Sequence, residues 1–486
     1  MKGDFTRFTF RKEKHYSGVL MQQGRVQLDA DWNEQIEIQS NLTRTTNTDV
    51  IGPCGAPAGN AGFSLTCTGS DILIGKGHYY VDGILCENDN EGISISKQDD
   101  LPADAVIVDN VRDCTSKPLG QATPGKYIAF LDVWQRHVTA LEDHGIREAA
   151  LGEPDTATRA QTVWQVKLIR AGAENENITC LSTPADWCAL LDGPTGKLRA
   201  QSEKSSVSKS PCILAPTAGY TGLENQLYRV EIHQGGRLGK ATFKWSRDNG
   251  AVVTSWLDQD GNDLSVGSLG RDRILGFADK QWVELTDDNR ESACRPGILV
   301  QIVKAEGQTL TIDPATATAP VDFGDFDKDG NPKVRRWDSS GELKVEIPGS
   351  NKGWIELEYG VEIKFSDGNA PYRTGDYWLI PARSSSGDVE WPFDANGSLP
   401  HGIKHHYCRL AVLDFNGNQW SAGAGSDCRQ LFPSTTELVN LYYVGGDGQE
   451  TWPGDDLQAP LQVRVANGQL PLENAVVEFS VTEGEG

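Results

Sequence analysis

The chain has 486 residues, enough for about three domains with several buried cores. Its 45 Lys and Arg residues against 68 Asp and Glu residues give a formal net charge of −23 at pH 7. Nucleic acids and anionic membranes are bound through an excess of Lys and Arg, so we expect neither as a partner. No stretch approaches the roughly 18 apolar residues of a membrane span, and the start lacks the apolar segment of a signal peptide. We therefore expect assembly in the cytoplasm without membrane insertion.

One convincing helix is predicted, near the N-terminus. The run from Asp31 to Leu42 has an acidic first turn and apolar residues at Trp32, Ile36 and Leu42. An extended segment, residues 18–30, precedes it. The sequence therefore predicts an extended N-terminal arm followed by one short amphipathic helix.

Beyond this helix the pattern changes to strands of period two, rich in Val, Ile, Thr, Tyr and Trp, separated by turn dipeptides such as Asn249-Gly250. The clearest hairpin pairs residues 78–81 with 84–87 around Asp82-Gly83. We predict a mainly β protein with several domains, built from antiparallel sandwiches and small barrels.

Changes in pattern along the chain predict five regions. They are an N-terminal docking arm and helix (1–60), a β-rich body (61–274), a small barrel-like module (275–320), the body continued (321–435) and the start of a truncated sandwich domain (436–486). Three short strands at 282–285, 297–302 and 309–312 favour the barrel. The last region has strands at 461–468 and 475–481, whereas such a sandwich needs about seven. We expect either that the polypeptide continues beyond Gly486 or that this segment lends strands to a neighbour.

Sequence signatures of catalysis are missing. The chain has no GxSxG, HExxH, GxxxxGK[ST] or GxGxxG motif. Residues 235–240 resemble a phosphate loop, but Ala241 stands where such a loop has Ser or Thr. We therefore expect no enzyme, no catalytic residue and no cofactor. The ten cysteines form no CxxC pair, which favours reduced, buried thiols over a disulfide framework.

Two clusters could bind a metal ion, and we weigh each against a simpler interpretation. Asp325, Asp327 and Asp329 alternate ahead of a glycine, as in a Ca²⁺ loop, but Arg336 replaces the bidentate Glu of an EF-hand, which favours a solvated acidic turn.

The second cluster gathers His401, His405 and Cys408, which are residue types that bind zinc. On a strand, alternation would divide these side chains between two faces, which favours packing over metal binding. We assign no metal site. The 13 tryptophans could stack on carbohydrate, but structural use is favoured.

Several long phrases occur together and in order, and they resemble a known family. They include MKGDFTRFTF, HYSGVLMQQGRVQLDADWNEQ, DVWQRHVTALED, GLENQLYRVEIH, ATFKWSRDNG, PKVRRWD and GDYWLIPAR with HGIKHHY. Over residues 1–430 the chain resembles a large bacterial family of unknown biochemical function that is encoded in clusters for phage-tail-like contractile injection systems. Residues 453–486 resemble the opening of a bacterial Ig-like domain. The family has no known catalytic residues.

This resemblance implies a structural component of the injection particle, at its baseplate, cage or fibre-attachment end, docked through the N-terminal arm. Its partners would be baseplate, spike or sheath proteins and copies of itself, with contact to a target-cell surface where the particle is released from the cell. The alternative is a receptor-binding or glycan-binding module of a tail fibre or adhesin. A hydrolase of envelope polymers is the enzymatic alternative.

Overall fold

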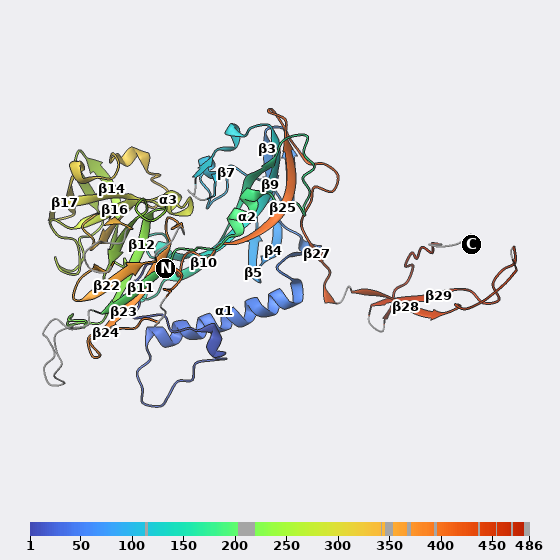
Figure 1. Cartoon of the computed structure of the whole chain (residues 1–486), viewed down its shortest axis with the longest axis horizontal. Coiled ribbons are helices and arrows are strands. Elements are labelled where there is room, and N and C mark those ends of the chain that lie inside the picture. The colour runs from blue at the N-terminus through green and yellow to red at the C-terminus, as the bar shows by residue number, and fades with distance from the viewer. Residues whose placement is uncertain are drawn as a thin grey trace.

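The computed structural model describes residues 1–111, 115–202, 219–341, 343–345, 353–366, 371–392, 396–435, 438–452, 454–467 and 470–480. Within these ranges three α-helices accompany many short strands (Figure 1), and nearly all strand pairs are antiparallel. The predicted mainly β fold is confirmed. A packed body contains most of the chain, and a small sheet near the C-terminus extends away from it (Figure 1).

The helices are α1 (Asp29–Ile51), α2 (Ala185–Leu191) and α3 (Asp288–Ser292). α1 is longer than predicted, with 23 residues, so the expectation of a short helix is wrong. Its polar second half contains neither Gly nor Pro, and the helix continues until Gly52. There the backbone turns to φ 97°, and the Gly52 N–H donates to the Thr48 carbonyl at 2.8 Å.

A six-stranded sheet forms the centre of the body. Its order is β26 (Trp420–Ser421), β25 (His406–Phe415), β9 (Gly125–Val138), β10 (Arg159–Gly172), β7 (Ile107–Asn110) and β8 (Thr115–Lys117). Successive side chains of β9 face opposite sides. Leu131 joins the large core on one side, while Phe130 packs on Trp187 of α2 with ring centroids 5.5 Å apart. Both faces of β9 are therefore buried.

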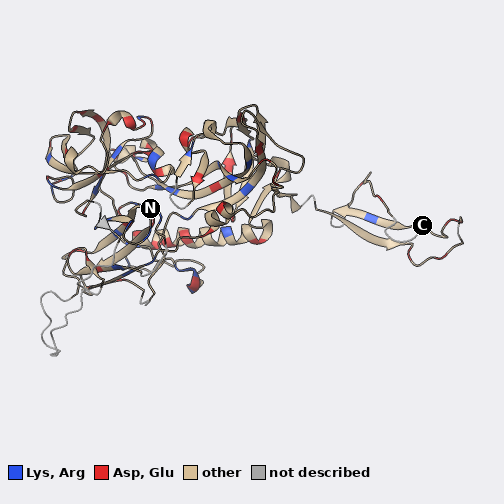
Figure 2. Ribbon diagram, turned by 45° about the horizontal axis from the view of Figure 1, so that its top comes forward, with Lys and Arg blue, Asp and Glu red and all other residues tan. Residues whose placement is uncertain are grey.

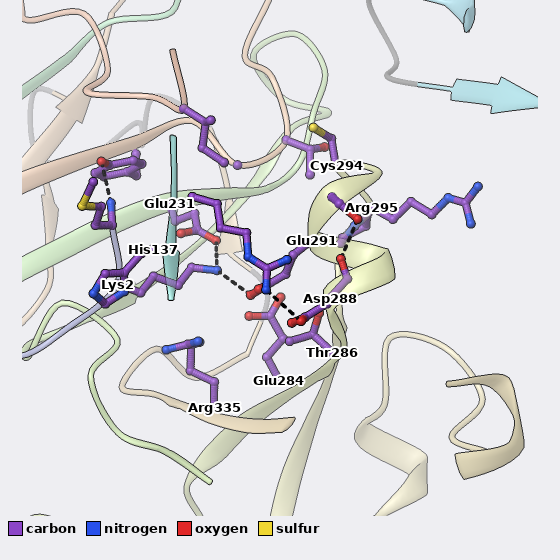
Figure 3. Close-up of a pocket in the computed structure, with 18 of the residues that line it drawn as sticks. Lys2, His137, Glu231, Glu284, Thr286, Asp288, Glu291, Cys294, Arg295 and Arg335 are labelled. Carbon is purple, nitrogen blue, oxygen red and sulfur yellow. Dashed lines mark hydrogen bonds and ion pairs between the residues drawn. The ribbon is translucent and has the colours of Figure 1, made fainter. Parts of the chain in front are cut away.

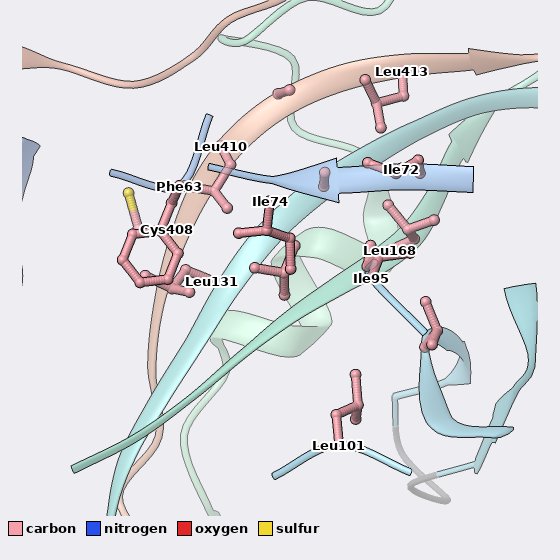
Figure 4. Packing of buried hydrophobic residues seen from close by; sticks show 14 of the residues in the cluster. Phe63, Ile72, Ile74, Ile95, Leu101, Leu131, Leu168, Cys408, Leu410 and Leu413 are labelled. Atoms are coloured by element: carbon pink, nitrogen blue, oxygen red, sulfur yellow. The ribbon is translucent and has the colours of Figure 1, made fainter. Parts of the chain in front are cut away.

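Two smaller sheets contribute to the large core. One contains β27 (Leu431–Phe432), β1 (Cys54–Pro57), β4 (Gly77–Val81) and β5 (Ile84–Asn88); the other contains β2 (Leu65–Thr68), β3 (Asp71–Ile74) and β6 (Ile93–Ser94). β4 and β5 form the predicted hairpin, which is confirmed. Ile72 of β3 points into this core near Leu413 of β25, and Ile74 lies in the same core near Leu410 (Figure 4).

A second core lies between two further sheets. They are β20 (Leu343–Lys344), β13 (Thr242–Ser246), β12 (Gln226–Gln234), β23 (Tyr377–Arg383) and β24 (Asp388–Val389), and β11 (Leu198–Ser202), β22 (Val361–Phe365) and β21 (Ile355–Glu356). Phe243, Phe365 and Trp378 meet there and are almost completely buried. Apolar residues from both sheets thus form one continuous core.

A closed barrel contains the three strands predicted between residues 282 and 312. Its order is β14 (Val253–Asp260), β15 (Asp263–Val266), β18 (Thr309–Asp313), β17 (Ile298–Glu306), β16 (Trp282–Thr286) and β19 (Lys333–Trp337). Pairing of β14 with β19 closes the ring. Trp256 fills one end, with its ring centroid 4.7 Å from that of Phe323 and 4.9 Å from that of Phe326.

The C-terminal sheet contains β28 (Val439–Gly445), β29 (Gln462–Asn467) and β30 (Leu470–Pro471). β29 matches the first strand predicted in this region. The second predicted strand, residues 475–481, is wrong over 475–480, which form no strand, and Val481 lies outside the described residues. Most apolar side chains of this sheet are exposed to solvent.

The cysteine prediction is partly wrong. Cys180 and Cys428, 248 residues apart, form a disulfide, with Cα atoms 5.3 Å apart. Cys188 is a free thiol but is exposed. Cys114 and Cys212 lie outside the described residues. Spacing along the sequence gave no signal for the pair, because the fold alone brings the two cysteines together.

Candidate functional site

The N-terminal arm, residues 1–28, begins as part of the body. Phe5 and Phe8 pack against Leu227, Tyr377 and Leu379. The segment passes so closely that a Cβ added at residue 3, a glycine, would lie 2.8 Å from the Phe5 ring and 2.9 Å from the ring of His137. The first residues are therefore anchored in the fold.

The second half of the arm, which we call the arm loop (residues 15–28), projects beside α1 (Figure 1). Leu20 is 90% exposed and Val26 is 82% exposed. Gln35 of α1 tethers the loop, because its side-chain oxygen accepts from the Val19 N–H at 2.6 Å. The arm loop is thus held in place while its apolar side chains stay exposed to solvent.

α1 continues this exposed apolar surface. Thr6 is fixed to Asp29 by hydrogen bonds of 2.9 Å from its backbone N–H and 2.6 Å from its hydroxyl. Trp32 and Ile36 nevertheless remain 62% and 52% exposed. Helix and loop together present apolar side chains to solvent, as an interface with another protein requires.

Opposite charges fill the interior where the arm, the six-stranded sheet and the barrel meet. We call this cluster the charged junction, and it surrounds a cavity of about 160 Å³ (Figure 3); its residues are Lys2, Glu142, Arg229, Glu231, Lys244, Glu284, Asp288, Glu291 and Lys333. Lys2 Nζ lies 3.4 Å from Glu231 Oε1 and 3.5 Å from Glu291 Oε1. Lys333 Nζ lies 2.6 Å from Glu142 and 2.7 Å from Asp288. The junction ties the start of the chain to the barrel.

The electrostatics of the junction favour a structural role. Burial opposes ionisation of Glu284, but Lys244, Lys2 and His233 together outweigh it and lower the pKa of Glu284 to about 2. Burial likewise opposes the charge on Lys333, yet its three carboxylate partners raise its pKa above the usual value. Such groups keep their charge near neutral pH, so they are poor general acids and bases.

The carboxylates of the acidic turn, Asp325, Asp327 and Asp329, do not form a metal-binding group. Asp327 accepts hydrogen bonds from the Asn289 side chain at 2.8 Å and from the Asp329 N–H at 3.0 Å. Among the residues that the structure describes, no group of His, Cys, Asp and Glu is arranged to hold a metal ion. The solvated turn at Asp325, Asp327 and Asp329 remains the better interpretation.

The side chains of the histidine segment, residues 401–408, also point to different partners. His401 packs beside the ring of Tyr377, and Cys408 is buried with its sulfur 3.3 Å from the Tyr79 hydroxyl. His405 instead points to Asp132 of β9, with Nδ1 2.6 Å from Oδ1. The structure therefore does not bring His401, His405 and Cys408 together.

Tryptophan serves mainly in the interior, as predicted. Seven of the thirteen are buried: Trp134, Trp187, Trp245, Trp256, Trp337, Trp378 and Trp420. Only Trp32 and Trp452 have large exposed surfaces.

Sequence reasoning missed the charged junction. Its residues come from the arm, the loop after β9, β12, β13, β16, α3 and β19 and follow no local motif. Acidic and basic residues also occur throughout the rest of the body (Figure 2), so charge in the sequence did not mark this place. No helix within the described ranges combines the length and apolarity needed to cross a membrane.

The fold and the arm define a multi-sheet β protein with a closed barrel and a projecting apolar loop. The chain belongs to a family of unknown function, DUF6519, whose model matches residues 1–185 and 191–441. The match includes the arm and the whole barrel. Searches of curated proteins and of solved structures found no match.

Proposed function

We propose that the protein is a structural component of a phage-tail-like contractile injection system and that it docks through its N-terminal arm. Its place would be the baseplate, the cage or the fibre-attachment end, with particle proteins or further copies of the chain as neighbours. The resemblance over residues 1–430 supports the type of particle. The resemblance of the last residues to an Ig-like domain supports an outward extension.

The observation that carries this proposal is the contrast within the arm. Phe5 and Phe8 are anchored in the body, whereas Leu20 and Val26 are held in solvent beside Trp32. Covering a leucine or valine side chain contributes about 1.5–3 kcal/mol. A partner that buries the arm loop and α1 would therefore gain several such contributions from a surface that is already positioned.

The test is incorporation into particles purified from the native source. We expect Trp32→Ala to prevent co-sedimentation with sheathed, tail-like particles, because exposed tryptophans at interfaces often contribute more than about 2 kcal/mol. The isolated variant should keep the circular dichroism spectrum and the melting temperature of the wild type. Normal incorporation of this folded variant would contradict docking through the arm.

A matched pair of leucines adds the control. Leu20 lies on the arm loop and is 90% exposed, whereas Leu223 lies elsewhere on the body and is 96% exposed. Leu20→Ala should reduce incorporation, and Leu223→Ala should leave it unchanged. Equal effects of the two variants would show that the arm loop has no special role.

A further inference from the structure

A cysteine, a histidine and an aspartate from three separate parts of the chain meet in one cleft of the body. Cys294 lies two residues after the end of α3, His405 directly precedes β25, and Asp132 lies within β9. His405 Nδ1 lies 2.6 Å from Asp132 Oδ1, and Lys167 Nζ lies 2.9 Å from Asp132 Oδ2. Cys294 lines the same cleft as His405, and its thiol is the other side chain whose interaction raises the pKa of the His405 ring.

The imidazole is held in a fixed orientation. Its ring centroid lies 4.8 Å from that of Trp134 and 6.0 Å from that of Tyr407, with which it is stacked. Because Nδ1 faces the Asp132 carboxylate, Nε2 is the ring nitrogen left for the thiol. This is the order of groups that activates a cysteine nucleophile: thiol, imidazole, orienting carboxylate.

The backbone also fixes the thiol. Cys294 has φ 55°, a left-handed conformation that is uncommon for any residue other than glycine. Two hydrogen bonds maintain this turn: the Cys294 N–H donates to Glu291 at 3.2 Å, and the Arg295 N–H donates to Arg290 at 2.8 Å. The position of the sulfur is thus set by the end of α3.

The charges around the pair favour a thiolate and an imidazolium. Burial opposes the charge on His405, but Asp132 outweighs it and raises the pKa of His405 to about 9. Burial also opposes ionisation of Cys294, yet His405 and then Lys167 lower the pKa of this thiol. Asp376 lines the same cleft and interacts electrostatically with His405, and burial raises the pKa of Asp376 to about 6.

Cys294 lies in the wall of a cleft and not in one of the packed cores. Cys294 is half-buried and lines a cleft of about 770 Å³, together with Asp132, Lys167, Thr374, Ile403 and His405. Two other free thiols differ from Cys294, because burial raises the pKa of Cys67 and of Cys86. At Cys294, a lowered thiol pKa coincides with a position in the wall of a cleft.

We propose that Cys294 and His405 are catalytic residues, with Asp132 as a positioning residue, and that the cleft takes an acyl group from an ester or thioester donor. The Cys294 sulfur attacks the carbonyl carbon and forms the new C–S bond. The bond to the leaving oxygen or sulfur breaks, and that atom takes the proton from His405 Nε2. Water then attacks the acyl carbon, gives a proton to Nε2, and releases the acid and the Cys294 thiolate.

The first test measures the reactivity of the thiol in the intact protein. Cys188 is exposed and serves as the internal control. At about pH 6, well below the ordinary thiol pKa of about 8.5, iodoacetamide should alkylate Cys294 at least about tenfold faster than Cys188. His405→Asn should remove this difference and move the pH profile of Cys294 towards that of an ordinary thiol. Equal rates at the two cysteines of the wild type would overturn the proposal, whether or not the variant folds.

The second test measures acyl transfer. With p-nitrophenyl acetate the wild type should release a burst of nitrophenolate equal to the amount of protein, with one acetyl group on Cys294 by peptide mass analysis. Cys294→Ala should abolish the burst and Cys188→Ala should preserve it. Asp132→Asn should retain acylation but shift its pH profile. A burst that survives Cys294→Ala, or no burst in the wild type, would contradict acyl transfer at this site.

Discussion

The six-stranded sheet of the body and the C-terminal sheet both contain strands with many apolar residues. They differ in how far those residues are buried. Leu131 of β9 is completely buried, whereas Leu441 of β28 is 62% exposed. The body sheet has a core on each face, while the C-terminal sheet has few buried apolar side chains beyond Ala466. Alternation of residue types therefore predicts a strand, but a second layer decides whether that strand contributes a core.

The largest expected difference in stability between the two regions comes from removing a buried charge. Lys333 is 1% exposed and contacts three carboxylates, so Lys333→Met leaves these buried charges without their cation. We expect a loss of about 3–5 kcal/mol in the free energy of unfolding, measured by urea denaturation. Arg464→Met in the C-terminal sheet, where Arg464 is exposed above the Tyr442 ring, should change it little. Comparable losses would mean that the two regions do not differ.

The leucine pair tests apolar burial directly. Leu131→Ala should lower the free energy of unfolding by about 2–5 kcal/mol, because it opens a cavity in a packed core. Leu441→Ala should stay within about 0.5 kcal/mol, because the side chain is already in water. A large effect at Leu441 would indicate a second layer over the C-terminal sheet in solution.

The third prediction is a gain of stability in the body. Burial raises the folded-state pKa of Asp376 to about 6, above the ordinary value of about 3.9. The folded state therefore holds this proton more tightly, and its contribution is lost as the pH rises from about 3.9 to about 6. Asp376→Asn should match the wild type near pH 4 and be more stable by up to about 3 kcal/mol near pH 7.

The measurement is urea denaturation at both pH values, with Asp455→Asn as the control. Asp455 is an exposed residue beyond β28, and its substitution should change stability at neither pH. An Asp376→Asn variant that is less stable than the wild type near pH 7 would show that the ionised carboxylate stabilises the body.

The smallest expected effect is that of removing residues 438–486. The packed cores of the body contain none of the residues that the structure describes in this segment. The melting temperature of the body should therefore stay the same, as measured by near-ultraviolet circular dichroism. A clear decrease would reveal contacts between the C-terminal sheet and the body.

Local pattern predicted a substantial part of the fold. The hairpin at residues 77–88 and the barrel strands β16, β17 and β18 follow from alternation and turn dipeptides, since both act between near neighbours. The length of α1 was underestimated, because its polar second half lacks an apolar face although nothing there breaks the helix. The strand expected at 475–481 has strand-forming residues, but its described part, 475–480, pairs with no strand among the described residues.

The candidate sites were less predictable. The arm loop was marked in the sequence as an extended segment ahead of a helix. The charged junction was not, because Lys2 and Lys333 are 331 positions apart and meet Glu291 only after folding. The expectation that the chain is not an enzyme stays a prediction, and the cleft at Cys294 now gives it a direct test.

The sequence by itself determined the β class, the turns, the N-terminal helix and the acidic balance, because each depends on composition or on residues close together in the chain. Tertiary structure alone decided that Cys180 bonds Cys428 and that His405 faces Asp132 rather than Cys408. The physical reason is that side-chain chemistry acts over a few ångströms, and only the packing of distant strands brings these groups within that range.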